Sequence, residues 1–385
     1  MKKQYKVFIL IFIAQLLIFF PPVNLFSQDS AEDYIERGIN FAVNMDFDSA
    51  IIEFSGAIRL EPGLARAWQL RGRAYYAKAS RVAYILKDFS VVDAYMTSGH
   101  VSPDLLPVYN LAASDFTQSI LLDPNNTQVY AERARLNVDI GSYATVMSDC
   151  NRSIALNPKY AEPHIILGMM YYDFNNYSRA FDHFERAILA DSLDSTAYSW
   201  RGFIYDHLGD YANAIADYSE SIRLNPGIYS IYNLRGMIYY SLGDFDLALA
   251  DFESVISLDR TNEDAYVLLS LIYLIKENQS QSMANINQAI RLNSAEYEYY
   301  YIRGIIHYNF GNINNAITDF TRAINNSHEF KDYQLAAIYN NRGDAYYSIR
   351  RYDLAVVDYD KAYRIEPDNP EYLADLENAR KMIRR

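Results

Sequence analysis

Hydrophobic and small residues recur at helical spacing over residues 195–228, a stretch that contains the plan of the whole chain. In its first half Tyr198 and Gly202 lie four residues apart, which is the spacing of one helix face. Asp210 follows a glycine at the centre, and Asp is a preferred N-cap residue of a new helix. The second half keeps helical spacing as far as Pro226, whose ring prevents the helix from continuing. The stretch therefore predicts two amphipathic helices joined by a tight turn.

The same 34-residue pattern recurs eight more times, which indicates a stack of one supersecondary unit rather than separate globular domains. Each repeat has a small residue at its eighth position, and most have an aromatic residue at the fourth. A glycine inside a helix costs about 1 kcal/mol relative to alanine, so its recurrence at one offset indicates that two helices approach closely there. The nine repeats begin at Ala31, Ala65, Thr127, Ala161, Ser195, Tyr229, Glu263, Tyr297 and Ala336.

This frame resembles the tetratricopeptide repeat (TPR) family over residues 31 to about 385. The resemblance rests on the aromatic residues at the fourth position and the small residues at the eighth and twentieth. It implies an all-α, right-handed superhelical solenoid of helix-turn-helix pairs. We expect nine repeats over residues 31–369, followed by a capping helix over residues 370–385 that covers the exposed end of the stack.

Two insertions interrupt the frame. The second repeat contains 28 extra residues, at about 76–107, and five extra residues, 331–335, precede the last repeat. Within the longer insertion, residues 81–97 have their apolar side chains on one face and predict an additional amphipathic helix. Residues 98–107 contain two prolines and predict a loop. The insertion could contribute to a binding face, cover it as a flap, or form a dimer contact, and these alternatives stay open.

A charge pattern predicts a bridge between the two helices of most repeats. Seven repeats have Arg at the seventh position and, sixteen residues later in the frame, an acidic residue on the second helix. The two repeats with Leu167 and Leu269 at the seventh position have His183 and Asn285 in place of the acid, so both partners are lost together. We interpret the pattern as an ion pair; the alternative is two solvated charges worth about 0.2–1 kcal/mol. The predicted pairs are Arg37–Glu53, Arg71–Asp115, Arg133–Asp149, Arg201–Asp217, Arg235–Asp251, Arg303–Asp319 and Arg342–Asp358.

The resemblance also implies where a partner would bind. In TPR proteins the first helices line a concave surface through the second, fifth, ninth, twelfth and thirteenth positions of each repeat. In the middle of this chain these positions, together with the neighbouring sixth position of one repeat, are mostly aromatic or apolar, which favours a binding groove. The alternative is that a tightly wound superhelix fills its own interior with these side chains. The candidate groove residues are Trp200, Phe203, Asn233, Met237, Tyr240, Leu271, Leu274, Tyr301, Ile305 and Tyr308.

The sequence offers no pattern typical of an enzyme, a metal site or a cofactor site. No two of the six histidines have the i, i+4 spacing of a helical zinc site, and no GxSxG, Walker-type or GxGxxG motif occurs in the required context. The single cysteine, Cys150, cannot form an intramolecular disulfide and is interpreted as a small buried side chain. The net charge of −13 would repel a nucleic-acid backbone. We therefore predict no catalytic residues, no cofactor, no metal and no nucleic-acid partner.

Residues 1–28 predict a secretory signal. Lys2, Lys3 and Lys6 precede a 14-residue apolar run at 7–20, which two prolines then end. The run is shorter than the about 20 residues that span a bilayer. An uncleaved anchor, which would bring membrane contact, is the alternative. We expect an exported bacterial protein that is periplasmic, outer-membrane associated or secreted.

These observations predict a non-enzymatic scaffold that binds a protein or peptide partner, in the setting of an envelope assembly. An apolar groove with acidic surroundings suits an amphipathic helix or an extended peptide with basic flanks. Binding of chaperone tails is not expected, because no repeat has the Lys that the family uses at the fifth position. Two alternatives are a carbohydrate or cell-wall binding module, since aromatic faces also stack on sugars, and a self-assembling structural solenoid.

Overall fold

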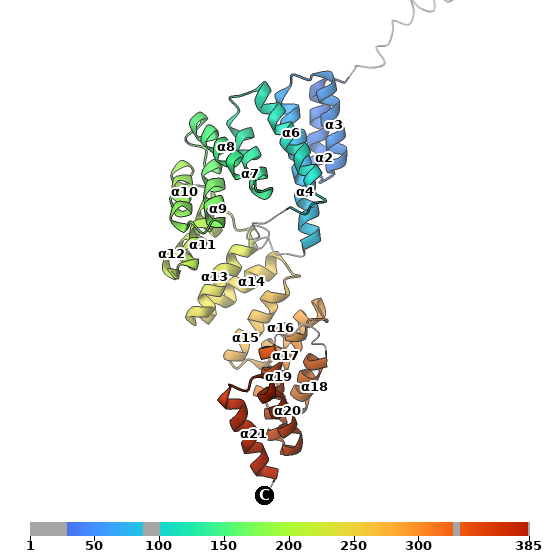
Figure 1. The fold of residues 1–385 in the computed structure, drawn as a ribbon, viewed down its shortest axis with the longest axis vertical. Helices are drawn as coiled ribbons and strands as arrows, with labels where there is room; N and C mark the ends of the chain where they lie inside the picture. Colours follow the sequence, from blue (N-terminus) through green and yellow to red (C-terminus); the bar gives the residue numbers. More distant parts are fainter. Residues whose placement is uncertain (1–28, 88–100, 326–331, 384–385) are drawn as a thin grey trace, which may run out of the picture. The chain divides into compact units, whose positions relative to one another are not determined.

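The computed structural model describes residues 29–87, 101–325 and 332–383 of the chain (Figure 1). All nineteen elements in these ranges are α-helices, and these ranges contain no β-strand. The all-α fold class is therefore confirmed. The predicted signal segment lies outside the described residues. No helix in the described ranges is long and apolar enough to cross a membrane.

The chain divides between Ser192 and Leu193 into two compact bodies, which are described separately below. The N-terminal body contains α2 (Ala31–Val43), α3 (Phe47–Leu60), α4 (Ala65–Lys87), α6 (Leu106–Leu122), α7 (Thr127–Asp139), α8 (Tyr143–Leu156), α9 (Glu162–Asp173) and α10 (Tyr177–Ala190). The C-terminal body contains α11 (Ser195–His207), α12 (Tyr211–Leu224), α13 (Tyr229–Leu242), α14 (Phe245–Leu258), α15 (Glu263–Ile275), α16 (Gln279–Leu292), α17 (Tyr297–Asn309), α18 (Ile313–Asn325), α19 (Asp332–Ser348), α20 (Tyr352–Ile365) and α21 (Pro370–Ile383).

Within each body the helices stack as pairs. The first helix of a repeat packs most extensively on the second helix of the same repeat, and that second helix packs on the first helix of the next repeat. In the central repeat, Gly209 has a positive φ of 78° and ends the turn after α11. Asp210 then caps α12, because its side chain accepts a hydrogen bond from the Asn213 backbone N–H. This local order produces the helical solenoid that the frame predicts.

An aromatic ring explains why glycine recurs at the eighth position. A Cβ placed on Gly304 would lie 2.6 Å from ring atoms of Phe320, which is buried on the second helix of the same repeat. A Cβ on Gly236 would lie 3.0 Å from Cε1 of Phe252. The ring occupies the twenty-fourth position, which the sequence pattern did not single out. The same contact recurs at Gly38–Phe54, Gly72–Phe116, Gly168–Phe184, Gly202–Tyr218 and Gly343–Tyr359.

The arginines of the seventh position lie in contact with the acidic residues of the second helix. In the sixth repeat, Arg235 Nε donates to Asp251 Oδ2 at 2.9 Å and its Nη2 donates to Oδ1 at 2.7 Å. The Asp251 side chain is only 5% exposed, so this is a largely buried, forked ion pair. Arg37 and Glu53 share one bond of 2.7 Å instead. The other forked pairs are Arg71–Asp115, Arg133–Asp149, Arg201–Asp217, Arg303–Asp319 and Arg342–Asp358.

Five of these arginines also reach the preceding repeat, which the sequence pattern did not predict. Arg235 Nη1 donates to Ser219 Oγ at 2.8 Å, and Ser219 lies on α12, the second helix of the repeat before. Each such arginine therefore ties together three helices rather than two. Equivalent bonds join Arg71 to Ser55, Arg133 to Thr117, Arg303 to Asn287 and Arg342 to Thr321.

The two insertions differ from the predictions in how they begin and end. The first seven residues of the expected extra helix, 81–87, continue α4 instead of starting a new element, and residues 88–100 lie outside the described ranges. Of the predicted loop over residues 98–107, residues 101–105 are non-helical as expected, but the last two residues are helical, because α6 begins at Leu106. Proline is compatible with the first turn of a helix, where its missing N–H would have no partner. The extra residues before the last repeat lengthen α19, which begins at Asp332.

The last helix, α21, packs on α20 and buries Leu376 and Ala379 against Ala355 and Tyr359.

Candidate functional site

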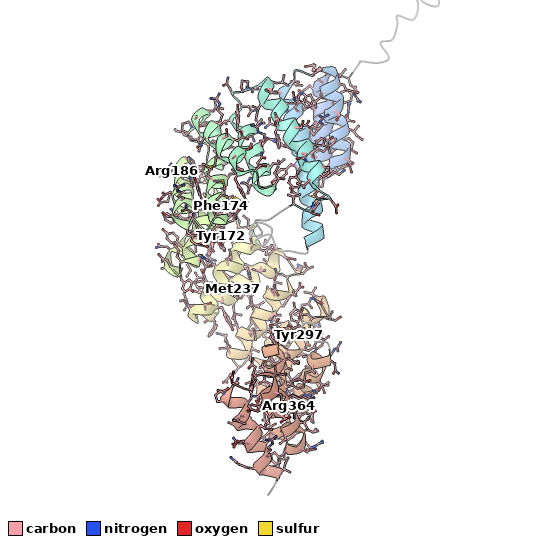
Figure 2. The ribbon with its side chains drawn as sticks, in the orientation of Figure 1. Tyr172, Phe174, Arg186, Met237, Tyr297 and Arg364 are labelled. Atoms are coloured by element: carbon pink, nitrogen blue, oxygen red, sulfur yellow. The ribbon has the colours of Figure 1, made fainter. Side chains whose placement is uncertain are left out.

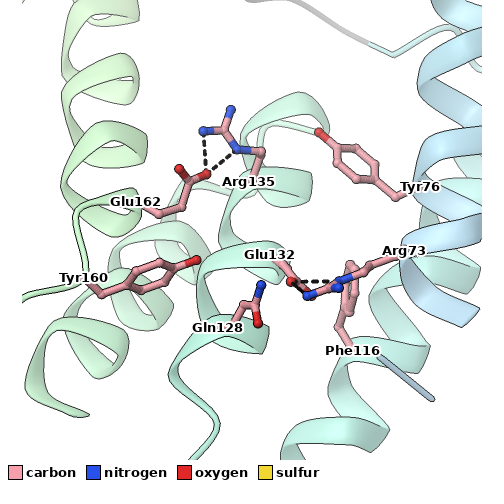
Figure 3. A pocket seen from close by; sticks show the side chains of 8 residues that line it. All are labelled: Arg73, Tyr76, Phe116, Gln128, Glu132, Arg135, Tyr160 and Glu162. Atoms are coloured by element: carbon pink, nitrogen blue, oxygen red, sulfur yellow. Dashed lines mark hydrogen bonds and ion pairs between the residues drawn. The ribbon is translucent and has the colours of Figure 1, made fainter. Parts of the chain in front are cut away.

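A pocket of about 260 Å³ opens in the N-terminal body among α4, α7 and the start of α9 (Figure 3). Its walls combine charged and aromatic side chains. The lining residues are Arg73 and Tyr76 of α4, Phe116 of α6, Gln128, Glu132 and Arg135 of α7, Tyr160 of the preceding turn and Glu162 of α9.

Five of the eight lining residues occupy repeat positions that the resemblance to TPR proteins places on the concave surface. Arg73 and Arg135 occupy the ninth position of their repeats, Tyr76 the twelfth, and Gln128 and Glu162 the second. The sequence-based groove prediction covered the fifth to eighth repeats and so missed this pocket. The signal was present, because the same offsets applied to the second, third and fourth repeats lead to these residues.

The first ion pair of the pocket, Arg73–Glu132, is stabilised by hydrogen bonds from the buried side-chain amide of Gln69. Arg73 Nε donates to Glu132 Oε1 at 2.9 Å, and Arg73 Nη2 contacts the same oxygen. Gln69 Nε2 donates to both oxygens of Glu132, at 3.3 and 3.0 Å, and Gln69 is only 7% exposed. The Gln69 carbonyl in turn accepts a hydrogen bond from Asn126 Nδ2 at 3.4 Å. The carboxylate of Glu132 is therefore held from two sides.

The second ion pair, Arg135–Glu162, is more open. Arg135 Nε and Nη2 approach the same oxygen of Glu162, Oε1, at 2.7 and 2.6 Å, as the dashed lines of Figure 3 show. The forked pairs between paired helices, by contrast, divide the two guanidinium nitrogens over both carboxylate oxygens. The Arg135 and Glu162 side chains are 26% and 29% exposed, so solvent and a ligand can reach them.

The tyrosines of the pocket keep their protons at neutral pH. Tyr76 donates its hydroxyl to Asp139 Oδ2 at 2.8 Å, and burial followed by the Asp139 charge raises its pKa well above the usual value. Burial raises the pKa of Tyr160 to about 12. Glu162 and Glu132 raise the Tyr160 pKa further, and their influence exceeds the opposite influence of the two arginines.

The predicted groove residues lie on α11, α13, α15 and α17 of the C-terminal body. Met237, labelled in Figure 2, is 40% exposed. Trp200 is only 8% exposed, and its ring packs edge-on against the ring of Phe203, with centroids 6.0 Å apart. Trp200 is therefore not open to a partner. The remaining groove residues are half-buried, and several pack against core side chains of their own repeats. The groove residues that pack against core side chains are Tyr240, Leu271, Leu274, Tyr301, Ile305 and Tyr308.

Polar groups surround the far end of the predicted groove. Asn341 Nδ2 donates to the Tyr301 hydroxyl at 2.9 Å, and Tyr359 donates its hydroxyl to Asp344 Oδ1 at 2.7 Å. Burial raises the pKa of Asp344 and also that of Asp375. The surface near Tyr301 is therefore less apolar than the sequence pattern indicated.

Two histidines of the fourth repeat, His164 and His183, lie 19 residues apart in the sequence and are in contact in the structure. The Nδ1 atoms of His164 and His183 lie 3.3 Å apart, and the His183 ring stacks on Tyr171 with centroids 5.4 Å apart. Burial lowers the pKa of both rings, and the neighbouring His164 helps to lower that of His183 to about 4. Among the described residues no three His, Cys, Asp or Glu side chains lie close enough to hold a metal ion. Burial raises the pKa of the Cys150 thiol, which is therefore unreactive at neutral pH.

Models of the tetratricopeptide repeat match residues 195–228, 229–262, 263–296, 297–327 and 336–369. Over these segments the chain matches tetratricopeptide repeats. The matched segments begin at the residues where the fifth to ninth repeats of the 34-residue frame begin. The matched segments correspond to the helix pairs α11–α12, α13–α14, α15–α16, α17–α18 and α19–α20 of the C-terminal body.

Several solved structures resemble the chain at low identity. YrrB, described as a TPR protein with an unusual peptide-binding site, is 21% identical over 50% of this chain and 96% of its own, with a TM-score of 0.42. A TPR protein from Parabacteroides merdae ATCC 43184 is 18% identical over 66% of this chain and 98% of its own, with a TM-score of 0.43. The APC/C hetero-tetramer Cut9-Hcn1 is 18% identical over 97% of this chain and 82% of its own, with a TM-score of 0.44. No curated protein sequence matches the chain.

Proposed function

We propose that the protein is a non-enzymatic scaffold that acts outside the cytoplasm. It binds a segment of a protein partner on its first-helix face, the surface formed by the first helices of successive repeats. The observation that carries the proposal is the pocket among α4, α7 and α9, which opens at the repeat positions expected to face a partner. Its volume of about 260 Å³ is below the about 300–1,000 Å³ of pockets that enclose a whole small molecule. The pocket therefore suits one or two side chains of a longer bound segment.

The chemistry of the pocket supports binding rather than catalysis. A general acid or base works best when its pKa lies near the operating pH. Tyr76 and Tyr160 stay protonated at neutral pH, because the pKa of Tyr76 is raised well above its usual value and that of Tyr160 is raised to about 12. The carboxylates of Glu132 and Glu162 are already paired with arginines. These groups can hold a ligand by hydrogen bonds and charge, which is what a scaffold requires.

A peptide library tests this proposal directly. Random peptides displayed on phage are selected on the purified protein, and the enriched peptides are then titrated against wild type and a double variant, Arg73→Ala with Glu162→Ala. We expect enrichment of a common motif and at least a tenfold loss of affinity in the double variant. The matched control is Arg223→Ala with Glu220→Ala, which removes an exposed ion pair on α12. Selection without enrichment, or equal affinity for the pocket variant, would contradict the proposal.

Export is supported by the basic start and the apolar run of residues 1–28, together with a single cysteine in the whole chain. Proteins that act in an oxidising compartment avoid unpaired thiols, and Cys150 is buried. Expression of the full chain in a bacterium, followed by fractionation and mass spectrometry of the N-terminus, tests this part. We expect the protein outside the cytoplasm with the first 28 residues removed, and an intact cytoplasmic chain would contradict export.

A further inference from the structure

We propose that the pocket among α4, α7 and α9 receives a basic side chain, lysine or arginine, of the bound partner segment. This inference rests on the proposed function and adds the chemical class of the partner.

The charges around the pocket do not cancel. The lining contains two arginines, Arg73 and Arg135, and two glutamates, Glu132 and Glu162, and Asp139, which accepts a hydrogen bond from the Tyr76 hydroxyl, adds a third carboxylate behind this lining. The excess is one negative charge at a site that is partly shielded from water, where charge interactions are stronger than in bulk solvent. The dominance of Glu162 and Glu132 at the Tyr160 hydroxyl agrees with this balance. A cationic side chain of a partner would neutralise this excess negative charge.

The pairing geometry leaves Glu162 able to accept another donor. Arg135 places both of its nitrogens on Oε1, so the second oxygen, Oε2, lies outside these two bonds. In the forked pairs, such as Arg235–Asp251, both carboxylate oxygens are used by one arginine. A carboxylate can accept more than two hydrogen bonds, so an ammonium or guanidinium group can bind Glu162 without displacing Arg135.

An acidic side chain would meet a different situation. To take the Nε and Nη2 donors of Arg73 it would have to displace Glu132, which Arg73 and the buried amide of Gln69 hold together. The displaced carboxylate is only 19% exposed. Leaving a largely buried charge without its partner is strongly unfavourable. The pocket therefore discriminates against acidic ligands.

The aromatic walls favour the same class of ligand. Tyr76, Phe116 and Tyr160 line the pocket together with the carboxylates. The face of an aromatic ring attracts ammonium and guanidinium groups, and the attraction increases when the cation is desolvated. The net charge of −13 would also speed the approach of a basic segment.

Short blocked peptides test the proposal. Acetyl-Gly-Arg-Gly-amide and acetyl-Gly-Lys-Gly-amide are titrated into the purified protein, and binding is followed by saturation-transfer NMR of the peptide. Acetyl-Gly-citrulline-Gly-amide has the shape of the arginine peptide without its charge, and acetyl-Gly-Glu-Gly-amide has the opposite charge. We expect saturable millimolar binding of the two basic peptides that weakens as salt is added, and no saturation with the other two.

Two variants locate the binding. Glu162→Gln, which removes the accessible carboxylate, is expected to lower the affinity for the arginine peptide at least tenfold. Asp139→Asn is a second variant in case the first does not fold. Glu220→Gln, on the exposed face of α12, is expected to leave the affinity unchanged. Equal binding of the arginine and citrulline peptides, tighter binding of the glutamate peptide, or full affinity in the folded pocket variants would overturn the inference. A displayed-peptide motif that is acidic but still depends on the pocket would leave the proposed scaffold function intact and reject only the basic ligand.

Discussion

The seventh residue of each repeat shows how much one position can contribute to this fold. Arg235 binds Asp251 on its own repeat and Ser219 on the preceding one, so its loss affects two interfaces. The pairing with Asp251 could be predicted from the sequence, because both charges are absent together in the repeats of Leu167 and Leu269. The bond to Ser219 could not, because serine, threonine and asparagine alternate at that position without a common charge.

We expect Arg235→Leu to lower the free energy of unfolding by about 3–5 kcal/mol, because it leaves the largely buried carboxylate of Asp251 without a partner. Adding Asp251→Asn should recover most of that loss, since the remaining group is neutral. Denaturant unfolding of the double-mutant cycle measures the coupling. Strictly additive losses would show that the two side chains do not interact. The exposed pair Glu220–Arg223 serves as a control, with an expected effect below about 1 kcal/mol.

The histidine pair of the fourth repeat makes stability depend on pH. The pKa of His183 is lowered from 6.5 to about 4, so between these values the unfolded chain binds more protons than the folded one. Stability is therefore greatest above pH 6.5 and falls as the pH falls toward 4. Replacing His183 by Asn should flatten this part of the profile of unfolding free energy against pH. A slope that His183→Asn does not alter would refute the assignment.

At the scale of helices, the close approach within each repeat depends on the glycine and on the ring that covers it. The recurring glycine could be predicted to lie at a helix contact, because no other reason explains a poor helix former at a fixed offset. The partner could not be identified, because Phe252 and its equivalents look like any other apolar residue of an amphipathic helix.

Gly304→Ala should destabilise the protein by about 1–3 kcal/mol, the usual effect of overpacking a core. The new Cβ would lie 2.6 Å from the ring of Phe320. Helix propensity alone would give the opposite sign, so thermal or denaturant unfolding separates the two effects. Gly63→Ala is the control, because a Cβ there has no neighbour within 4 Å. A variant at Gly304 that is as stable as wild type would show that the helices can separate without cost.

The insertions mark the limit of periodicity as a guide to elements. A helical pattern over 81–97 cannot show whether it starts a helix or continues one, because the spacing of apolar residues is the same in both cases. The structure continues α4 as far as Lys87. Pro107 resembles a loop residue in the sequence, yet it lies in the first turn of α6.

At the scale of the whole molecule, the repeat frame predicts the helix pairs, while the site depends on how successive repeats come together. The pocket joins the second, third and fourth repeats, and the residues of its two ion pairs, Arg73–Glu132 and Arg135–Glu162, lie 59 and 27 residues apart. The fixed offsets could have located this face, but not its charge balance, because the pairing of Arg73 with Glu132 across a 28-residue insertion has no sequence signature. The apolar groove predicted from the middle repeats is largely half-buried, so its side chains also serve the core.

The account depends most directly on where a bound segment lies. A photoreactive benzoyl-phenylalanine is placed at Gln128, which lines the pocket and is exposed, and each modified protein is irradiated with a peptide enriched on the wild-type chain. Matched positions are Met237 on the first-helix face of the C-terminal body and Tyr211 on a second helix, which are 40% and 39% exposed. The account predicts strong crosslinking at Gln128 and none at Tyr211, with mass spectrometry placing a basic residue of the peptide beside Glu162. Crosslinking that is as strong from Tyr211 as from Gln128, or absent from Gln128, would contradict it.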